Sequence, residues 1–466
     1  MHLPSGYQAM FTTAVFLITY AIIMSEKIHR TTIAFFSAAL VIVTGILSPE
    51  KAVEAIDWNT IGLLTGMMIL VGVTRETGLF EFLAIKSARL AKGEPLFIMA
   101  ALSGLTAFIS AFLDNVTTVL LIVPVTFAIA RRLELNPAPF LIPEILASNI
   151  GGTATLIGDP PNIMIGGAAG LGFMDFVFNL TPIIIVVHIL TIFCFKLIYR
   201  RQLVSRPELT RRIMELDEYR EIKDRALLRK CLFVLGVTIF GFVVHQYVNL
   251  ESSVIALSGA ALLLLLDRTD PERALHAVEW PVLFFFIGLF VVVGALEAVG
   301  AIEAVARFCL EITGGAMMPT AMLILWLSAL LSAFIDNIPF VATMIPMIQD
   351  MGRLSGISDL NLLWWALSLG ACLGGNGTAI GASANVVVIG MMEKRGLRIT
   401  FMDYMKVAFP LMLMSIGVCT AYLILWDRCR AGWLGWATVL FGLALGFFDR
   451  LLTRRLCVPA QGSGRR

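Results

Sequence analysis

Hydrophobic residues run along this chain in long blocks that short polar segments separate. A helix that crosses a lipid bilayer needs about 20 apolar residues. Blocks of that kind occur at residues 8–25, 31–47, 58–80, 176–198, 228–248, 253–266, 280–300, 407–426 and 431–448. The pattern predicts an all-α polytopic membrane protein. Because no basic segment precedes the first block and no small-residue cleavage site follows it, we expect that block to be a retained span.

Two further apolar blocks are each interrupted once by a polar segment. Residues 96–130 are broken at positions 114–118, and residues 318–350 are broken at positions 336–339. The arms of the first block are about 18 and 12 residues, too long for one span and too short for two. We therefore expect two re-entrant hairpins, each of which enters and leaves on the same side with its polar residues at the tip.

Residues 139–166 and 361–390 are apolar but contain glycine pairs and other helix-breaking residues. Gly151-Gly152 and Pro160-Pro161 interrupt the first segment, and Gly374-Gly375 interrupts the second. Consecutive prolines remove backbone donors and prevent a continuous helix. Unwound backbone at membrane depth is tolerated only where protein or a water-filled cavity satisfies it. The sequence thus predicts two broken helices.

The hairpins and broken helices form an internal repeat. The segment 110–115 recurs at 332–337, an offset of 222, and the glycine pair recurs at an offset of 223. We predict a first inverted repeat at residues 1–198, a charged cytoplasmic linker at 199–227 and a second inverted repeat at 228–430. A final transmembrane helix and a basic cytoplasmic tail are expected at 431–466.

The distribution of basic residues gives the expected orientation. Each half holds five expected crossings and one hairpin, and an odd number of crossings inverts the second half. When the loop 26–30 is placed in the cytoplasm, most of the 35 lysines and arginines fall on that side. The sequence predicts about eleven transmembrane helices, with the N-terminus outside, the C-terminus cytoplasmic and the two hairpins facing opposite sides.

Composition excludes several classes of protein. Apolar residues make up 58% of the chain and charged residues 15%, and the mean hydropathy is +0.87. A soluble enzyme, a disordered protein or a nucleic-acid binder could not hide this apolar surface. The seven cysteines show no paired spacing, so they predict neither disulfides nor a zinc site. The chain lacks a P-loop, a nucleophile elbow and an HExxH motif, so ATP-driven transport would need a separate ATPase subunit.

Asp114 and Asp336 are the sharpest candidates for a functional site. A carboxylate deep in a bilayer costs at least about 2.5 kcal/mol, yet one occurs at the same place in both halves. The functional interpretation is cation coordination, proton exchange or both. The structural alternative is a helix N-cap that satisfies the N–H groups of the turn, and the two roles can coexist.

Neutral oxygen atoms and glycines surround these carboxylates. Such hard ligands suit sodium or a proton-bearing water, whereas the glycines could instead serve close helix packing. Asp159 has no twin in the second half, so it either caps the next helix or biases one site toward cations. The predicted ion- and substrate-binding residues are Asp114, Asn115, Thr117, Thr118, Asn149, Gly151, Gly152, Thr153, Thr155, Asp159, Asn162, Asp336, Asn337, Gly374, Gly375, Asn376, Thr378, Ser383 and Asn385.

Inverted halves with paired broken helices point to a secondary transporter. We expect both tips to meet the broken helices near the bilayer centre, where the polar clusters form two pseudo-symmetric ion sites beside a central cargo site. No cofactor is expected apart from Na⁺ or H⁺ as coupling ion, and no metal beyond a transported sodium. Cys372 precedes the second glycine pair, but one thiol is a weak signal for a thiophilic ligand.

These motifs resemble the ion transporter superfamily. LASNIGGTATLIGDPPN, FLDNVTTVLL, FIDNIPFVATMIP and GACLGGNGTAIGASANVV are similar to the ArsB/NhaD group of arsenite permeases, sodium–proton antiporters and melanosomal P protein-like carriers. The divalent-anion/sodium symporters are more distant, because Asp-Asn here replaces their Ser-Asn tip. The resemblance covers nearly the whole chain and implies an elevator-type carrier and a homodimer. We expect the protein in the cell inner (plasma) membrane.

Three functions are open from sequence. The leading hypothesis is a proton- or sodium-coupled antiporter that exports arsenite, antimonite or sodium. The alternative is a sodium- or proton-coupled symporter of citrate or a dicarboxylate, although two carboxylates would repel a multiply charged anion unless sodium neutralised them. The third is a passive channel, which the inverted halves and broken helices disfavour.

Overall fold

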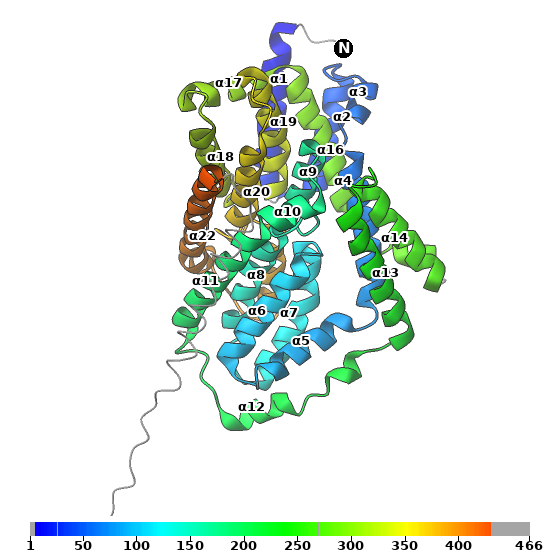
Figure 1. Cartoon of the computed structure of the whole chain (residues 1–466), viewed down its shortest axis with the longest axis vertical. Helices are drawn as coiled ribbons and strands as arrows, with labels where there is room; N and C mark the ends of the chain where they lie inside the picture. The colour runs from blue at the N-terminus through cyan, green and yellow to red at the C-terminus, as the bar shows by residue number, and fades with distance from the viewer. Residues whose placement is uncertain (1–4, 26, 268–269, 430–466) are drawn as a thin grey trace, which may run out of the picture.

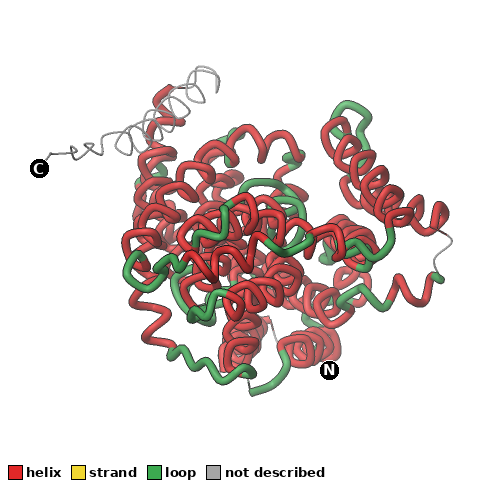
Figure 2. The backbone as a smooth tube through the Cα atoms, turned by 90° about the horizontal axis from the view of Figure 1, so that it is seen from below, coloured by secondary structure: helices red, strands yellow, loops and turns green. Residues whose placement is uncertain are grey.

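The computed structural model describes residues 5–25, 27–267 and 270–429. All regular structure within these ranges is helical, which confirms the predicted fold class (Figure 1 and Figure 2). The final transmembrane helix and the basic tail predicted at 431–466 lie outside the described residues.

The two halves contain the same succession of helices, except that the short helix α10 (Phe173–Asn179) has no counterpart in the second half. The helices of the first half are α1 (Ser5–Ser25), α2 (Arg30–Val43), α3 (Pro49–Glu54), α4 (Trp58–Arg75), α5 (Leu79–Leu90), α6 (Pro95–Ser110), α7 (Asn115–Arg132), α8 (Ala138–Gly152), α9 (Pro160–Ala169), α10 (Phe173–Asn179) and α11 (Thr181–Tyr199). The helices of the second half are α13 (Arg225–Val244), α14 (Ser252–Asp267), α15 (Pro271–Leu275), α16 (Trp280–Ala298), α17 (Ala301–Thr313), α18 (Met317–Ser332), α19 (Asn337–Ser355), α20 (Asn361–Gly374), α21 (Ser383–Glu393) and α22 (Phe401–Cys429).

Helices from the two halves pack in matched pairs. Helix α4 packs against α14, and its counterpart α16 packs against α2. In the same way α7 contacts α21, and α19 contacts α9. Figure 1 shows α5, α6 and α7 toward one end of the molecule and α17, α18 and α19 toward the opposite end. This exchange of equivalent partners is the arrangement expected when two repeats are related by a twofold rotation.

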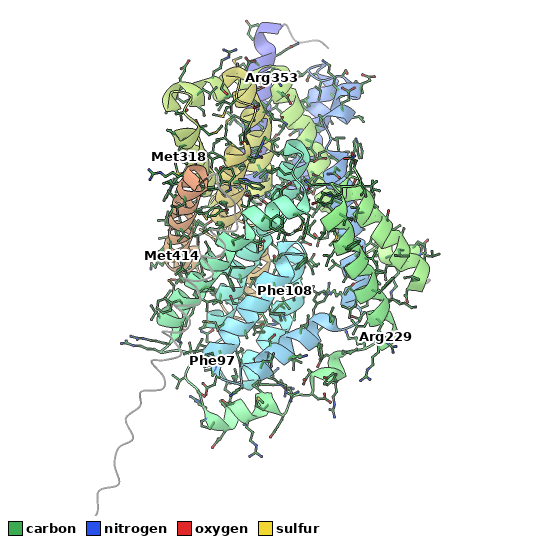
Figure 3. All side chains as sticks on the ribbon, viewed as in Figure 1. Phe97, Phe108, Arg229, Met318, Arg353 and Met414 are labelled. Carbon is green, nitrogen blue, oxygen red and sulfur yellow. The ribbon has the colours of Figure 1, made fainter. Side chains whose placement is uncertain are left out.

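Several helices have the length and composition of membrane spans. Six of the described helices are long and apolar enough to cross a bilayer, or up to eight if each bent pair is one span. The bends are 112° between α9 and α10 and 119° between α17 and α18. Large apolar side chains such as Phe97 and Phe108, both labelled in Figure 3, are exposed, with exposed fractions of 42% and 65%. The total of about eleven spans stays a prediction.

The hairpin arms differ in length from the sequence prediction. Helix α6 has 16 residues and α7 has 18, because α7 begins at Asn115 and not beyond the polar segment. The cause is a side-chain cap, since Asp114 Oδ1 accepts a hydrogen bond from Thr117 N at 2.9 Å. Asp336 caps α19 through Ile338 N at 3.4 Å. The structural alternative for both carboxylates is therefore confirmed, and Thr117 lies within helix α7.

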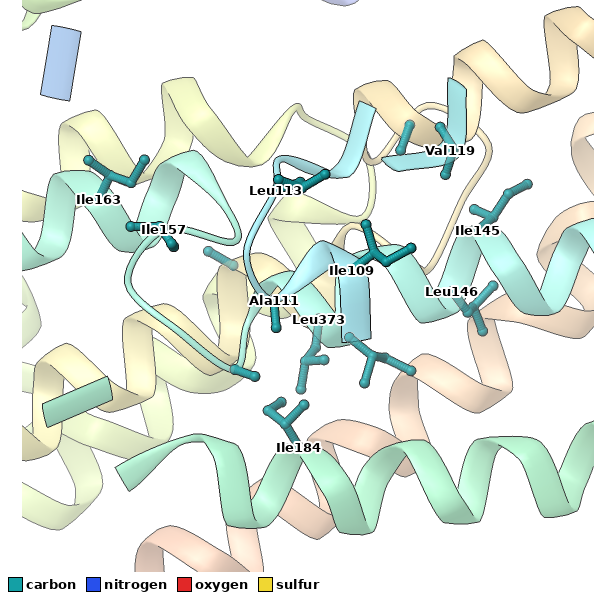
Figure 4. Close-up of a cluster of buried hydrophobic side chains, with 14 of the residues drawn as sticks. Ile109, Ala111, Leu113, Val119, Ile145, Leu146, Ile157, Ile163, Ile184 and Leu373 are labelled. Carbon is teal, nitrogen blue, oxygen red and sulfur yellow. The ribbon is translucent and has the colours of Figure 1, made fainter. Parts of the chain in front are cut away.

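Apolar side chains pack around the first hairpin tip (Figure 4). Ile109 and Leu113 flank the turn between α6 and α7 and are nearly fully buried. Ile145 and Leu146 on α8 belong to the same buried cluster, as does Leu373 on α20. Residues from both halves therefore form one continuous apolar core around the turn. Because apolar side chains surround it, the polar atoms of the turn must pair with one another.

The linker predicted at 199–227 contains regular structure. Helix α12 (Pro207–Met214) buries Leu209 and Ile213 and contacts α5 and α7, and η1 (Glu218–Glu221) packs on α5. Glu218 is 9% exposed and forms an ion pair with Arg89 of α5. The buried apolar residues of α12 and this ion pair therefore hold the charged segment against α5 and α7.

Replacing Glu218 by alanine should release this segment. The change leaves Arg89 without its carboxylate partner in a half-buried position, so linker detachment becomes more frequent. We expect the purified protein to be cleaved by trypsin within residues 199–227 several times faster than the unchanged protein. The matched control is Glu215→Ala, because the Glu215–Arg211 pair is exposed on both sides. Equal cleavage rates for both variants would show that the ion pair does not fasten the linker.

Candidate functional site

Each hairpin tip is fastened to the broken helix that follows it. Ser110 Oγ donates to the carbonyl of Ser148 at 2.7 Å, and the equivalent Ser332 Oγ donates to the carbonyl of Ala371 at 2.6 Å. A second hydrogen bond links each break to its tip. Thr155 donates to the Ala111 carbonyl, and Thr378 donates to the Ala333 carbonyl. These two threonines, which we predicted as ligands, hold the tips in place.

The unwound segments are closed by two equivalent asparagines. Asn162 Nδ2 donates to the carbonyls of Thr155 at 2.9 Å and Thr153 at 3.2 Å. Asn385 Nδ2 donates to the carbonyls of Gly375 and Thr378, both at 2.8 Å. Both asparagines are fully buried. Protein amides therefore satisfy part of the backbone that helix breakage leaves unpaired.

The glycine pairs lie where helices approach closely. A Cβ atom on Gly151 would collide with the backbone of Ala107 on α6, and one on Gly374 would meet the backbone of Ala329 on α18. Gly152 and Gly375 face the returning chain at Gly158 and Gly381 in the same way. This geometry supports the packing interpretation of the glycines, because a side chain at these positions would separate hairpin from broken helix.

Asn149 connects the two halves. Its Nδ2 donates to Asn376 Oδ1 at 2.9 Å and to Asn385 Oδ1 at 3.1 Å, both on the second half. Its Oδ1 accepts from Asn115 Nδ2 at 3.0 Å. Thr153 Oγ1 donates to the Asn149 carbonyl at 2.7 Å. Five predicted site residues thus belong to one buried network.

Cys372 occupies the position equivalent to Asn149. Its Sγ lies 3.6 Å from Asn162 Oδ1, an oxygen that also accepts from Ser368 Oγ at 2.6 Å. The thiol is fully buried. It contacts Asn162 of the first half, just as the equivalent Asn149 amide contacts Asn385 of the second half. It is therefore placed as a partner of Asn162.

A cavity of about 340 Å³ lies between the two halves. Its wall carries the carboxylates of Asp114, Asp159 and Glu279 and the guanidinium of Arg30. The remaining lining includes the amides Asn115 and Asn337, the hydroxyl residues Thr31 and Ser383, and the apolar residues Leu64, Met68, Val116, Val282, Ile338 and Val387. Acceptor oxygens from both tips and from one break therefore face a common space.

Asp159 is the most enclosed carboxylate of this cavity. Its side chain is 1% exposed, and each carboxylate oxygen lies 3.4 Å from Asn337 Nδ2 of the opposite hairpin. It makes no side-chain capping bond to α9, so the capping alternative is wrong. Pro160 and Pro161 offer no N–H at the first two positions of α9, and the Asp159 carboxylate instead faces Asn337. The equivalent position in the second half is Ala382.

Arg30 is a functional candidate that the sequence analysis counted only as a loop charge. It begins helix α2, and its Nη1 donates to Asp336 Oδ2 and Ser383 Oγ, both at 2.7 Å. Arg30 also lines a second cavity of about 290 Å³, on whose wall Asp336 lies. The sequence did contain a signal for Arg30. This arginine lies at the edge of an apolar block, whereas the equivalent position in the second half is the uncharged Ser252.

The two predicted ion sites are consequently unequal. Asp336 has a guanidinium partner, whereas Asp114 has no ion-pair partner within the described ranges and faces the larger cavity. Thr118 is fully buried, and its hydroxyl has no hydrogen-bond partner among the described atoms. No group of three or more His, Cys, Asp or Glu side chains capable of holding a metal occurs in the part of the chain that the structure describes.

Comparisons with known proteins place these features in a wider group. A family model described as a citrate transporter matches residues 20–370. An uncharacterised transporter of Mycobacterium tuberculosis is 42% identical over 420 residues, which are 89% of this chain and 98% of the relative. The P protein of Homo sapiens is 37% identical over 91% of this chain and 61% of its own length. The crystal structure of the Alcanivorax borkumensis YdaH transporter matches with a TM-score of 0.58 at 14% identity, covering 92% of this chain and 99% of that one.

Proposed function

The chain belongs to the citrate transporter family of secondary transporters, and from this premise we propose that it is a cation-coupled antiporter. Its relatives carry the names of transporters, so it is a multi-pass membrane transporter and not an enzyme. The observation that carries the proposal is the cavity between the halves, whose wall carries Asp114, Asp159 and Glu279.

The charge balance of this cavity favours a cation. Three carboxylates face one guanidinium, and that guanidinium is already paired with Asp336. The attraction between opposite charges rises as water is excluded, and carboxylate and amide oxygens are suitable ligands for sodium. Protons and sodium would compete for the same carboxylates, which is the basis of exchange.

The proposed transport cycle moves the hairpins and broken helices against the remaining helices. In this elevator-type movement, helices α6–α9 and α18–α21 carry the site past α2, α4, α14 and α16. Sodium or a neutral trihydroxide such as arsenite or antimonite would be exported in exchange for protons. We place the carrier in the plasma membrane with its N-terminus outside and its C-terminus in the cytoplasm, as the distribution of basic residues favours.

A second candidate function is symport of citrate or a dicarboxylate. The family description and the presence of Arg30 on both cavities favour it. Arginine binds carboxylates through a planar array of donors. Against this function, Asp114, Asp159 and Glu279 would repel a multiply charged anion unless bound sodium offset their charge.

Reconstituted liposomes containing a pH-sensitive dye separate these functions. We expect an outward sodium gradient to change the internal pH, and arsenite to do so if it is the cargo. Citrate should produce no proton flux and no uptake of labelled citrate. Saturable counterflow at fixed membrane potential would mark a carrier, and its absence would mark a channel. Sodium-dependent citrate uptake without proton exchange would replace the antiporter proposal with the symporter.

Cys372→Ser should leave arsenite resistance nearly intact if arsenite is the cargo. The thiol is fully buried and engaged with Asn162, so hydroxyl and amide groups are the expected partners of a neutral trihydroxide. Serine retains a donor toward Asn162. Resistance is measured as growth of an arsenite-sensitive host at matched expression, with Cys419→Ser as a buried control away from the site. A large loss in the Cys372 variant alone would assign arsenite binding to sulfur.

A further inference from the structure

Arg30 bridges two groups of helices through a partly buried ion pair. It lies on α2, which packs on α16, whereas its partners Asp336 and Ser383 belong to α19 and α21. The side chains of Arg30 and Asp336 are 25% and 15% exposed. The guanidinium also lies over the ring of Phe285, 5.1 Å from its centroid.

The guanidinium occupies the place that a mobile cation would take at this tip. Ser383 Oγ donates to the same Asp336 oxygen at 3.1 Å, so one carboxylate oxygen is shared between a cation and a hydroxyl. An arginine side chain does not lose its charge at physiological pH. The positive charge beside Asp336 is therefore fixed to the chain. A bound proton or sodium ion, by contrast, can leave its carboxylate.

The other tip has no such partner. The position equivalent to Arg30 is Ser252 at the start of α14, which carries no charge toward Asp114. The ionisable neighbours of Asp114 include Glu279, a second carboxylate on the same cavity. One tip carboxylate, Asp336, is thus directly paired with Arg30, whereas the other, Asp114, forms no ion pair within the described ranges and has Glu279 as a neighbour, a carboxylate that itself lies near Arg30.

We propose that Arg30 is a tethered cation that takes the place of a mobile coupling ion at Asp336 in the arrangement described here, and that the pair separates when α19 and α21 move past α2. The exchangeable cation then binds only beside Asp114 and Asp159. This inference rests on the proposed cation-coupled function and adds to it which of the two tips binds an exchangeable ion. Arg30 acts as a positioning residue, because it sets the charge of the second tip and takes no part in the exchange itself.

Removing the tethered cation should create a new sodium site. We propose to measure the unfolding temperature of the purified full chain in sodium chloride and in choline chloride at equal ionic strength. In Arg30→Gln, sodium should raise the unfolding temperature by at least about 2 °C more than it does in the unchanged protein. The double variant Arg30→Gln/Asp336→Asn should lose this additional shift. Arg307→Gln, which breaks an exposed pair with Glu303, is the control and should respond to sodium as the unchanged protein does.

The double variant also provides a test that does not require Arg30→Gln to fold. It removes both charges of the pair, so Asp336 is not left as a carboxylate without its partner. If Asp336 binds no mobile ion, the sodium concentration that gives half of the shift should stay within about twofold of its value in the unchanged protein. A tenfold increase would show that Asp336 binds sodium, and would overturn the inference.

The same measurements keep this inference separate from the proposed function. An Arg30→Gln protein that responds to sodium no more than the unchanged protein would refute the tethered cation, even if exchange is observed in liposomes. Absence of exchange in liposomes would refute the antiporter, whereas a gain of sodium response in Arg30→Gln would still assign the Asp336 position to Arg30.

Discussion

Replacing Asp159 by asparagine should reduce cation–proton exchange by at least about tenfold while the protein still folds. A hydrogen bond or contact to a charged group contributes about 1.5–3 kcal/mol, and 1.36 kcal/mol corresponds to a factor of ten in rate. Asp159 is the carboxylate that faces both the cavity and Asn337. Asparagine keeps its size and can pair with the Asn337 amide, so the loss would come from the missing charge.

The measurement is sodium-driven pH change in liposomes at matched protein density. Asp114→Asn should also lose exchange, because its cap to Thr117 can be made by an asparagine oxygen while its charge is gone. The matched control is Asp217→Asn in the linker, which removes an exposed carboxylate that caps η1 and should leave the rate unchanged. Exchange at the unchanged rate in both site variants would leave capping as the role of Asp114 and would remove the cation site from this cavity.

Gly151→Ala and Gly374→Ala should each destabilise the protein severely. A Cβ at either position would run into the backbone of the opposing hairpin helix, at Ala107 and Ala329 respectively. Main-chain atoms cannot rotate away as a flexible side chain can, so α8 would have to separate from α6, or α20 from α18. Overpacking of this kind costs about 1–3 kcal/mol and sometimes more, and we expect the upper part of that range.

Thermal unfolding of the purified protein, followed by its loss of monodispersity, checks this expectation. The matched control is Gly104→Ala on α6, in the same helix pair, where nothing lies within 4 Å of the added Cβ. This control should unfold at the same or a slightly higher temperature, because alanine favours helix over glycine. Unchanged stability with abolished transport in the Gly151 and Gly374 variants would show instead that these glycines make room for a ligand.

The sequence determined the class of the protein and the position of its breaks. Blocks of apolar residues predicted an all-helical membrane protein, and the glycine pairs predicted breaks in the two segments where α8 ends at Gly152 and α20 ends at Gly374. These features are local, because backbone geometry and periodicity act over a few residues. The repeat offset also anticipated which helices would be equivalent, since equivalent segments fold alike.

The tertiary structure decided which polar residues face the cavity and which serve the fold. Asn162, Asn385, Thr155 and Thr378 bond to carbonyls of the breaks and tips, whereas Asp159 faces Asn337 across the interface between the halves. An aspartate before a helix has the same sequence signature whether it caps that helix or not.

Arg30 shows most clearly what local sequence cannot determine. Its partner Asp336 lies 306 positions away along the chain, and nothing within its own segment distinguishes it from a charge at a membrane surface. Only the tertiary arrangement, in which the first residue of α2 meets the starts of α19 and α21, brings the guanidinium to that carboxylate. The equivalence of the repeats therefore follows from sequence, whereas the difference between their two tips arises from contacts between distant segments.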